Sequence, residues 1–181
     1  MEHDCATVTA EGPPSDIIEA RTEQEIAAVG RLLREFKTWC CGRYANRSWQ
    51  VETDLDPNAW ESELAALGER YASPDGALLL ARCGMRSAGC ATVRQIQGGL
   101  AEMKYLYVRP QYRAMGLGRR LTEAGLAWAR AHRCRALRLE AGDLQHEALA
   151  LYGDLGFHEI APYHPVPGEL AAHLVFLEAA L

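Results

Sequence analysis

The most informative stretch of the 181-residue sequence is Leu106–Leu121, which reads LYVRPQYRAMGLGRRL. It predicts a β-strand that ends at Arg109-Pro110, a loop with two glycines flanked by arginines, and a helix that begins at the end of the loop. Unpaired N–H groups at a helix N-terminus and the helix dipole favour an anion, and glycine lets a phosphate approach the backbone. The stretch therefore predicts a phosphate-binding loop, with pyrophosphate as its natural ligand.

Two common nucleotide-binding motifs do not fit this loop. A Walker loop requires G-x-x-x-x-G-K-[ST], and the sequence has neither this spacing nor the lysine. A dinucleotide fingerprint requires G-x-G-x-x-G, but Leu121 stands where the third glycine is required. An ordinary strand–loop–helix connection with incidental arginines is the remaining alternative.

Periodicity on both sides of the loop predicts alternating strands and helices. Residues 39–56 lack a clear period and are expected to form an irregular connection that lines a site. The order of elements predicts an α/β or α+β fold, with a mixed sheet and helices on its faces. Strands are expected over residues 16–20, 77–82, 89–96, 101–108 and 136–141, helices over 22–36, 57–71, 117–131 and 145–155, and a strand or short helix over 170–176.

Composition and charge exclude several classes of protein. Hydrophobic residues make up 49% of the chain, so residues 16–181 are expected to form a single domain after a flexible tail at residues 1–15. The net charge of −5 provides no cationic field for nucleic acid or a membrane, and no apolar run approaches the roughly 20 residues of a membrane helix. With no signal sequence at its start, the chain is expected to be cytoplasmic, and its six cysteines, without C-x-x-C spacing, to be reduced.

Two motifs resemble those of the GNAT superfamily of acyl-CoA-dependent N-acyltransferases. Residues 113–118 match its [Q/R]-x-x-G-x-[G/A] pyrophosphate loop, and residues 148–157 resemble its A-x-x-L-Y-x-x-x-G-F signature. The order and separation of the motifs also match the family, and the resemblance extends from about Ile17 to the C-terminus. It implies a mixed, mostly antiparallel central sheet flanked by helices. It also implies transfer of the acetyl group of acetyl-CoA to a primary amine by direct attack in a ternary complex, without a metal.

The resemblance further implies which residues bind acetyl-CoA. In the family, the strand before the loop separates from its neighbour at a bulge, and its backbone pairs with the pantetheine arm. The loop N–H groups are expected to hold the pyrophosphate, and Arg120 is a further candidate for a phosphate contact. Gln145 stands where the family often has Asn. The expected cofactor-binding residues are Leu106, Tyr107, Val108, Arg113, Ala114, Met115, Gly116, Leu117, Gly118, Arg119 and Gln145.

Acetyl transfer needs a group that accepts the proton of the amine and a donor for the departing thiolate. Tyr152 matches the family tyrosine whose hydroxyl lies near the CoA sulfur. Glu102 lies six residues before Val108, the offset at which some members carry a base, and the period of two along a strand predicts that both share a face. The structural alternatives are a packed aromatic for Tyr152 and a solvated strand-end carboxylate for Glu102.

Other aromatic and histidine residues give weaker signals. His146, His158 and His164 lack metal-ligand spacing and are expected to be scattered surface residues. Core packing is an alternative explanation for Trp60. The candidates for the wall of an acceptor groove are Trp39, Tyr44, Trp49 and Trp60.

Nothing in the sequence identifies the acceptor, which is expected to be a small molecule rather than a protein. The main alternative function is a non-catalytic acyl-CoA-binding regulatory protein on the same fold, which would keep the loop at residues 113–118 without requiring Tyr152 or Glu102. A homodimer, which is frequent in the family, is an open alternative to a monomer.

Overall fold

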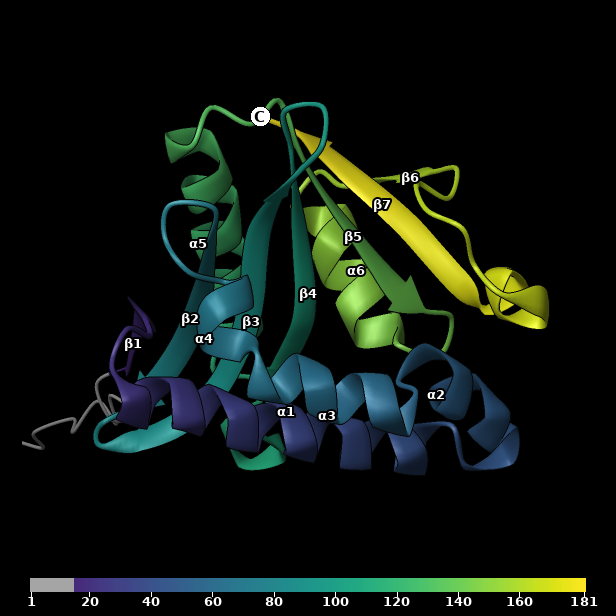
Figure 1. The fold of residues 1–181 in the computed structure, drawn as a ribbon, viewed down its shortest axis with the longest axis horizontal. Helices are drawn as coiled ribbons and strands as arrows, with labels where there is room; N and C mark the ends of the chain where they lie inside the picture. The colour runs from purple at the N-terminus through teal and green to yellow at the C-terminus, as the bar shows by residue number, and fades with distance from the viewer. Residues whose placement is uncertain (1–14) are drawn as a thin grey trace, which may run out of the picture.

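The computed structural model describes residues 15–181. The strands are β1 Ser15–Glu19, β2 Gly76–Cys83, β3 Arg86–Ile96, β4 Leu100–Val108, β5 Ala136–Gly142, β6 His158–Ile160 and β7 Leu174–Ala180. The helices are α1 Glu23–Arg43, α2 Ser48–Asp54, α3 Pro57–Ala65, α4 Leu67–Arg70, α5 Leu117–Ala131 and α6 His146–Asp154. All seven strands form one sheet of order β1-β2-β3-β4-β5-β7-β6 (Figure 1). Because β4 and β5 are parallel and the other neighbours antiparallel, the sheet is mixed and mostly antiparallel, as the sequence predicts.

Helices cover both faces of the sheet, and successive side chains of β2 point to opposite faces. Leu79 and Ala81 belong to a core cluster with α5 and α6, which lies on what we call the α5 face. Leu78 and Leu80 belong to a second cluster with α1, α3 and α4, on the α1 face. A strand that is buried on both faces carries apolar residues at successive positions, which accounts for the continuous apolar run of β2.

The first helix is longer than its sequence pattern predicts. Its predicted capping box at Thr22 is present. The apolar stripe continues in four-residue steps from Phe36 through Cys40 to Tyr44, all of them buried, so the helix does not end near Phe36. The expected irregular connection over residues 39–56 is therefore wrong. This segment consists of the end of α1, one 3-10 turn and α2, which is too short for its period to be visible in the sequence.

A β-bulge interrupts β4 near its centre. Tyr107 lies opposite Cys90 of β3 and Lys104 lies opposite Thr92, so two residues of β4 face one residue of its partner. Tyr105, in the bulge, has a φ of 58°, in the left-handed region. The extra residue reverses the alternation of side chains between the two faces beyond this point.

The bulge overturns the expectation that Glu102 and Val108 share a face. Ala101 and Met103 belong to the cluster on the α5 face, so Glu102 between them points to the α1 face. Val108, beyond the bulge, packs against the cluster on the α5 face. The period of two holds only along a regular strand, and the bulge that the family resemblance implies in this strand interrupts it.

Two contacts fix the position of β4 relative to its neighbours. β4 pairs with β5 over three residues in each strand, 100–102 with 136–138, and the strands then diverge (Figure 1). Just after β4, the Arg109 guanidinium donates to both carboxylate oxygens of Glu35 in α1, over 2.8 and 2.6 Å. This ion pair holds the diverging end of β4 against α1.

The remaining expectations differ from the structure only in detail. Residues 1–14 of the expected tail lie outside the described residues, and Ser15 already belongs to β1. The helix predicted over residues 57–71 is divided at Ala66 into α3 and α4, and residues 168–173 form a 3-10 turn before β7. The five cysteines among residues 15–181 are free thiols. None of the helices described has the length and hydropathy to cross a bilayer.

Two glycine-to-alanine substitutions are expected to change stability in opposite directions. A Cβ on Gly89 would lie 2.5 Å from the carbonyl oxygen of Tyr107, so Gly89→Ala should lower the free energy of unfolding. The cost of such overpacking is about 1–3 kcal/mol. Gly153 lies in α6 with open space where a Cβ would stand, so Gly153→Ala should raise the free energy of unfolding by up to about 1 kcal/mol. Urea unfolding measures both values, and equal midpoints for the two variants would contradict the packing described at Gly89.

Candidate active site

A groove of about 560 Å³ lies between the end of β4, the start of α5 and α6. Trp39 of α1 and Ala148 of α6 form part of its walls. Met115 does not line the groove, and its side chain is exposed. The other ten expected cofactor-binding residues all line it: Leu106, Tyr107, Val108, Arg113, Ala114, Gly116, Leu117, Gly118, Arg119 and Gln145.

The loop at the start of α5 has the backbone geometry of an anion site. Gly116, the N-cap of α5, has a φ of 73°, and Ala114 has a φ of 62°, so both adopt left-handed conformations. The N–H of Arg120 donates to the C=O of Gly116 over 3.1 Å. The N–H groups that precede Arg120 in the first turn therefore have no acceptor within the helix. Together with the helix dipole, they can hold a phosphate group in the groove.

The three arginines of the loop differ in their surroundings. The Arg113 guanidinium lies over the ring of Trp39, 5.2 Å from its centroid, and faces the groove. Arg119 forms an exposed ion pair with the last residue of α6 over 3.3 Å. Arg120 instead donates to the hydroxyl and carbonyl oxygens of Ser15, over 2.6 and 3.0 Å, and does not line the groove. Arg120 therefore holds β1 in place, and the structure does not place it for the expected phosphate contact.

A smaller cavity, of about 60 Å³, lies where β4 and β5 diverge, and we call it the splay cavity. It shares Leu106 and Gln145 with the groove, so a ligand that fills the groove reaches the gap in the sheet. Its walls come from both faces of the sheet, with Met103, Leu106 and Tyr152 from the α5 face and Phe36, Leu55 and Tyr105 from the α1 face.

Tyr152 reaches the splay cavity from α6. It is 5% exposed and packs against Phe157, with 5.6 Å between the ring centroids. Burial raises the pKa of its hydroxyl well above the ordinary value of tyrosine. The Tyr152 hydroxyl is therefore protonated at neutral pH, which a hydrogen-bond donor at this position requires.

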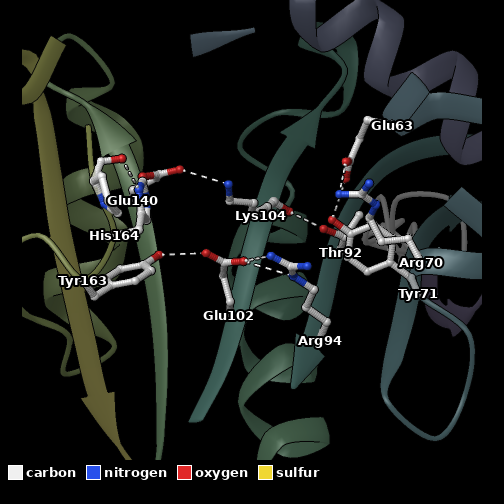
Figure 2. Close-up of polar contacts among 11 residues, drawn as sticks. Glu63, Arg70, Tyr71, Thr92, Arg94, Glu102, Lys104, Glu140, Tyr163 and His164 are labelled. Carbon is white, nitrogen blue, oxygen red and sulfur yellow. Dashed lines mark hydrogen bonds and ion pairs between the residues drawn. The ribbon is translucent and has the colours of Figure 1, made fainter. Parts of the chain in front are cut away.

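Glu102 lies in a different cavity, of about 380 Å³, on the α1 face beyond the covering helices. Both of its carboxylate oxygens are engaged (Figure 2). Oε2 accepts hydrogen bonds from Nε and Nη2 of Arg94, over 3.1 and 2.8 Å, and Oε1 accepts one from the Tyr163 hydroxyl over 3.2 Å. We call this space the polar cavity; it is lined by Arg94, Glu102, Lys104, Arg138, Tyr163 and His164, with Ile96 and Leu100 among its apolar residues.

A second group of charges lies beside the first (Figure 2). Two of its members, Lys104 and Glu140, line the splay cavity. One oxygen of Glu140 in β5 lies 3.1 Å from Nζ of Lys104, and the other lies 2.7 Å from Nε2 of His164. Burial opposes the charged form of Lys104, but the nearby charges of Glu140 and Glu102 outweigh this effect and raise its pKa. Lys104 lines both the splay cavity and the polar cavity, so the two spaces adjoin at its side chain.

Asp54, the last residue of α2, also lines the splay cavity. Asp54 as a whole residue is exposed. Desolvation of its carboxylate and the charge of Glu140 nevertheless raise the pKa of this group to about 6. The charges of Lys104 and His164 oppose this rise. The carboxyl group is therefore a weaker acid than an ordinary aspartate, and it is mostly ionised at neutral pH.

The structure corrects the expected aromatic wall. Tyr44 and Trp60 are core residues, each 3% exposed, and Trp60 packs edge-on against Tyr105. Trp39 lines the groove that contains the predicted cofactor residues, and Trp49 lies against a histidine before β7. These four aromatics therefore do not form one surface.

Most of the charged residues beside the splay cavity were not predicted from the sequence. His146 and His158 are exposed, as expected, but His164 contacts Glu140 and is not a scattered surface residue. Lys104 could have been predicted as a site residue, because Glu102 and Lys104 stand at alternate positions and mark a polar face within an otherwise apolar strand. Among residues 15–181, no three His, Cys, Asp or Glu side chains are grouped as metal ligands.

Comparisons with known proteins agree with this geometry. The chain matches the sequence model of the Acetyltransferase (GNAT) family over residues 27–157. An IAA acetyltransferase of Azospirillum brasilense is 38% identical over 98 residues, 54% of this chain and 64% of that protein. An uncharacterized N-acetyltransferase of Schizosaccharomyces pombe is 34% identical over 118 residues, 63% of this chain and 72% of that protein.

Solved structures share the fold at low sequence identity. An acetyltransferase from Streptococcus agalactiae has a TM-score of 0.71 at 19% identity, covering 92% of this chain and 98% of that one. PaiA N-acetyltransferase from Thermoplasma acidophilum, solved in complex with coenzyme A, has a TM-score of 0.71 at 17% identity, covering 93% and 99% of the two chains. The family match spans both sequence motifs and most of the described sheet, and the chain therefore belongs to the GNAT acetyltransferase family.

Proposed function

We propose that this chain transfers the acetyl group of acetyl-CoA to a primary amine by direct attack in a ternary complex. The observation that carries this proposal is that three neighbouring spaces share lining residues. The groove beside the anion-binding loop meets the splay cavity at Leu106 and Gln145, and the splay cavity meets the polar cavity at Lys104. A thioester held in the groove and an amine that arrives from the α1 face would therefore meet in the gap between β4 and β5.

The groove suits coenzyme A in its backbone chemistry. The N–H groups at the start of α5 would bind the pyrophosphate, with Arg113 and Arg119 at the groove as further cations. Beyond residue 102, β4 has no pairing with β5, so its backbone groups on that side are available to the amides of the pantetheine arm. Gln145, which lines both the groove and the splay cavity, would contact the arm near its thiol end.

The chemistry requires two proton movements. The amine nitrogen attacks the thioester carbonyl carbon, the carbon–sulfur bond breaks, and the thiolate receives a proton from the Tyr152 hydroxyl. The proton that the amine loses passes to a carboxylate. We assign this role to Asp54, which lines the splay cavity, rather than to Glu102, whose two oxygens are engaged by Arg94 and Tyr163.

Ligand binding should distinguish this proposal from a nucleotide-binding function. Both CoA and acetyl-CoA should raise the melting temperature of the protein in a thermal-shift assay, because each binds the folded state selectively. ATP and NAD should have much smaller effects, since the loop lacks the residues that recognise them. Stabilisation by ATP or NAD without stabilisation by either CoA compound would contradict the proposal.

Removal of the Tyr152 hydroxyl should distinguish an enzyme from a non-catalytic binding protein. Tyr152→Phe keeps the ring packed against Phe157 but removes the proton donor, so kcat should fall by about 100-fold with little change in the KM for acetyl-CoA. Release of CoA thiol across a panel of amines measures this. Tyr71→Phe is the matched control and should keep the wild-type kcat, because Tyr71 lines neither the groove nor the splay cavity. A wild-type protein that binds CoA but shows no amine-dependent thiol release would instead be the non-catalytic regulator.

The pH profile should identify Asp54. Its carboxyl must be ionised to accept a proton, so with a pKa of about 6 the wild-type kcat/KM should fall as the pH drops below 6. Asp54→Asn should lose this acidic limb and lower kcat/KM at pH 8 by about 100-fold. Glu52→Gln, on the same helix and outside the splay cavity, should keep both the rate and the limb. An unchanged acidic limb in Asp54→Asn would exclude Asp54 as the proton acceptor.

A further inference from the structure

The polar cavity has a charge arrangement that the acetyl transfer itself does not require. It lies on the α1 face, where none of the described helices covers the first halves of β4 and β5, and its wall at Lys104 adjoins the splay cavity. Arg94 of β3 and Arg138 of β5 are the cross-strand partners of Glu102, one on each side. Two guanidinium groups therefore flank one buried carboxylate on the floor of the cavity.

In two ion pairs at this cavity the cation is clearly more exposed than the carboxylate, whereas Arg138 and Glu178 are nearly equal, at 24% and 22%. The side chain of Arg94 is 36% exposed and that of Glu102 is 4% exposed. The values are 26% and 13% for Lys104 and Glu140. Tyr163 contacts Glu102 and His164 contacts Glu140 (Figure 2). A ligand that enters the cavity therefore meets cations first, unlike the splay cavity, where Asp54 and Glu140 are the carboxylates.

Both arginines keep donors that their carboxylate partners do not use. Arg94 donates from Nε and Nη2 to Glu102, and Arg138 donates from Nε to Glu178 over 2.6 Å. Within residues 15–181 neither guanidinium has a second carboxylate partner. The Arg138 guanidinium lies over the ring of Tyr163, 5.3 Å from its centroid, so the ring occupies its face and leaves its edge to a ligand. A guanidinium edge matches the two oxygens of a carboxylate.

We propose that the acetyl acceptor is an amine that carries a carboxylate, and that Arg94 and Arg138 bind this carboxylate in the polar cavity. The inference rests on the proposed function and names its substrate class. The lining of this cavity has three cations, Arg94, Lys104 and Arg138, and one carboxylate, Glu102. Glu140 and Glu178, which lie outside the lining, pair with Lys104 and Arg138 and offset part of this charge. The positive charge that is left suits a single negative charge better than a phosphate dianion.

The geometry also sets the spacing between the two groups of the acceptor. The amine must reach the splay cavity beside Lys104, whereas the carboxylate binds beside Glu102, two residues away along β4. Two residues of a strand span roughly 7 Å. An α-amino acid is too short for this distance, and an ω-amino acid with a chain of four or five carbons spans it.

The test compares acceptors that differ in one group. The probes are 5-aminopentanoate, its carboxamide, pentylamine, norvaline and 4-aminobutylphosphonate, each assayed with acetyl-CoA for thiol release. The kcat/KM for 5-aminopentanoate should exceed that for the carboxamide by about 10- to 100-fold, the range expected for loss of a charge-assisted hydrogen-bond pair. Norvaline should be a poor acceptor, and the phosphonate should rank below the carboxylate.

Variants should locate the effect at the polar cavity. Arg138→Gln should abolish the preference for 5-aminopentanoate over its carboxamide, and Arg138→Lys should restore part of this preference. Arg135→Gln removes an exposed arginine just before β5 and should keep the wild-type preference. Equal kcat/KM values for the carboxylate and the carboxamide in wild type, or a preference that survives Arg138→Gln, would overturn the substrate class alone. Absence of thiol release with every amine would overturn both the substrate class and the proposed function.

Discussion

Hydrogen bonding between β4 and β5 ends after three residue pairs, and the rest of the site depends on this interruption. The bulge at Tyr105 turns β4 at this level, and the Arg109–Glu35 ion pair holds its far end against α1. The strand edge that β5 leaves unpaired becomes part of the groove, and the gap becomes the splay cavity. A fully paired sheet would separate the two faces, and no ligand on one side would reach a group on the other.

The polar residues along the gap are held by a second constraint. A carboxylate that loses most of its water is stable only beside a cation or strong donors. Glu102 and Glu140 satisfy this requirement with partners from neighbouring strands, Arg94 and Lys104. The Lys104–Glu140 pair therefore ties β4 to β5 beyond their last backbone pair, and the Arg94–Glu102 pair ties β4 to β3 at the level of that last pair. The same pairs fix the positions of the cations at the surface, so stability and ligand recognition use the same side chains.

The parts of the site that the sequence predicted are those fixed by local chemistry. Two glycines between a strand and a helix specify an anion-binding loop, and ten of the eleven residues expected to bind cofactor line one groove. The family resemblance implies a bulge in this strand, but its position could not be predicted from the residues, because tyrosine has no preference for the left-handed backbone that Tyr105 adopts. Contacts between distant segments also could not be predicted from the sequence. Glu140 and His164 are 24 residues apart, and only the path of the chain after β6 brings them together.

The short pairing between β4 and β5 also has a mechanical meaning. Three backbone residue pairs join the strands β1 to β4 to the strands β5, β7 and β6, and side-chain contacts such as Lys104–Glu140, together with the covering helices, add further links between the two halves of the sheet. The easiest opening motion of a folded protein follows its weakest internal boundary. In the proposed ternary complex, the reactants would contact both halves of the sheet across the gap. Their binding would stiffen this boundary, and the release of products would loosen it again.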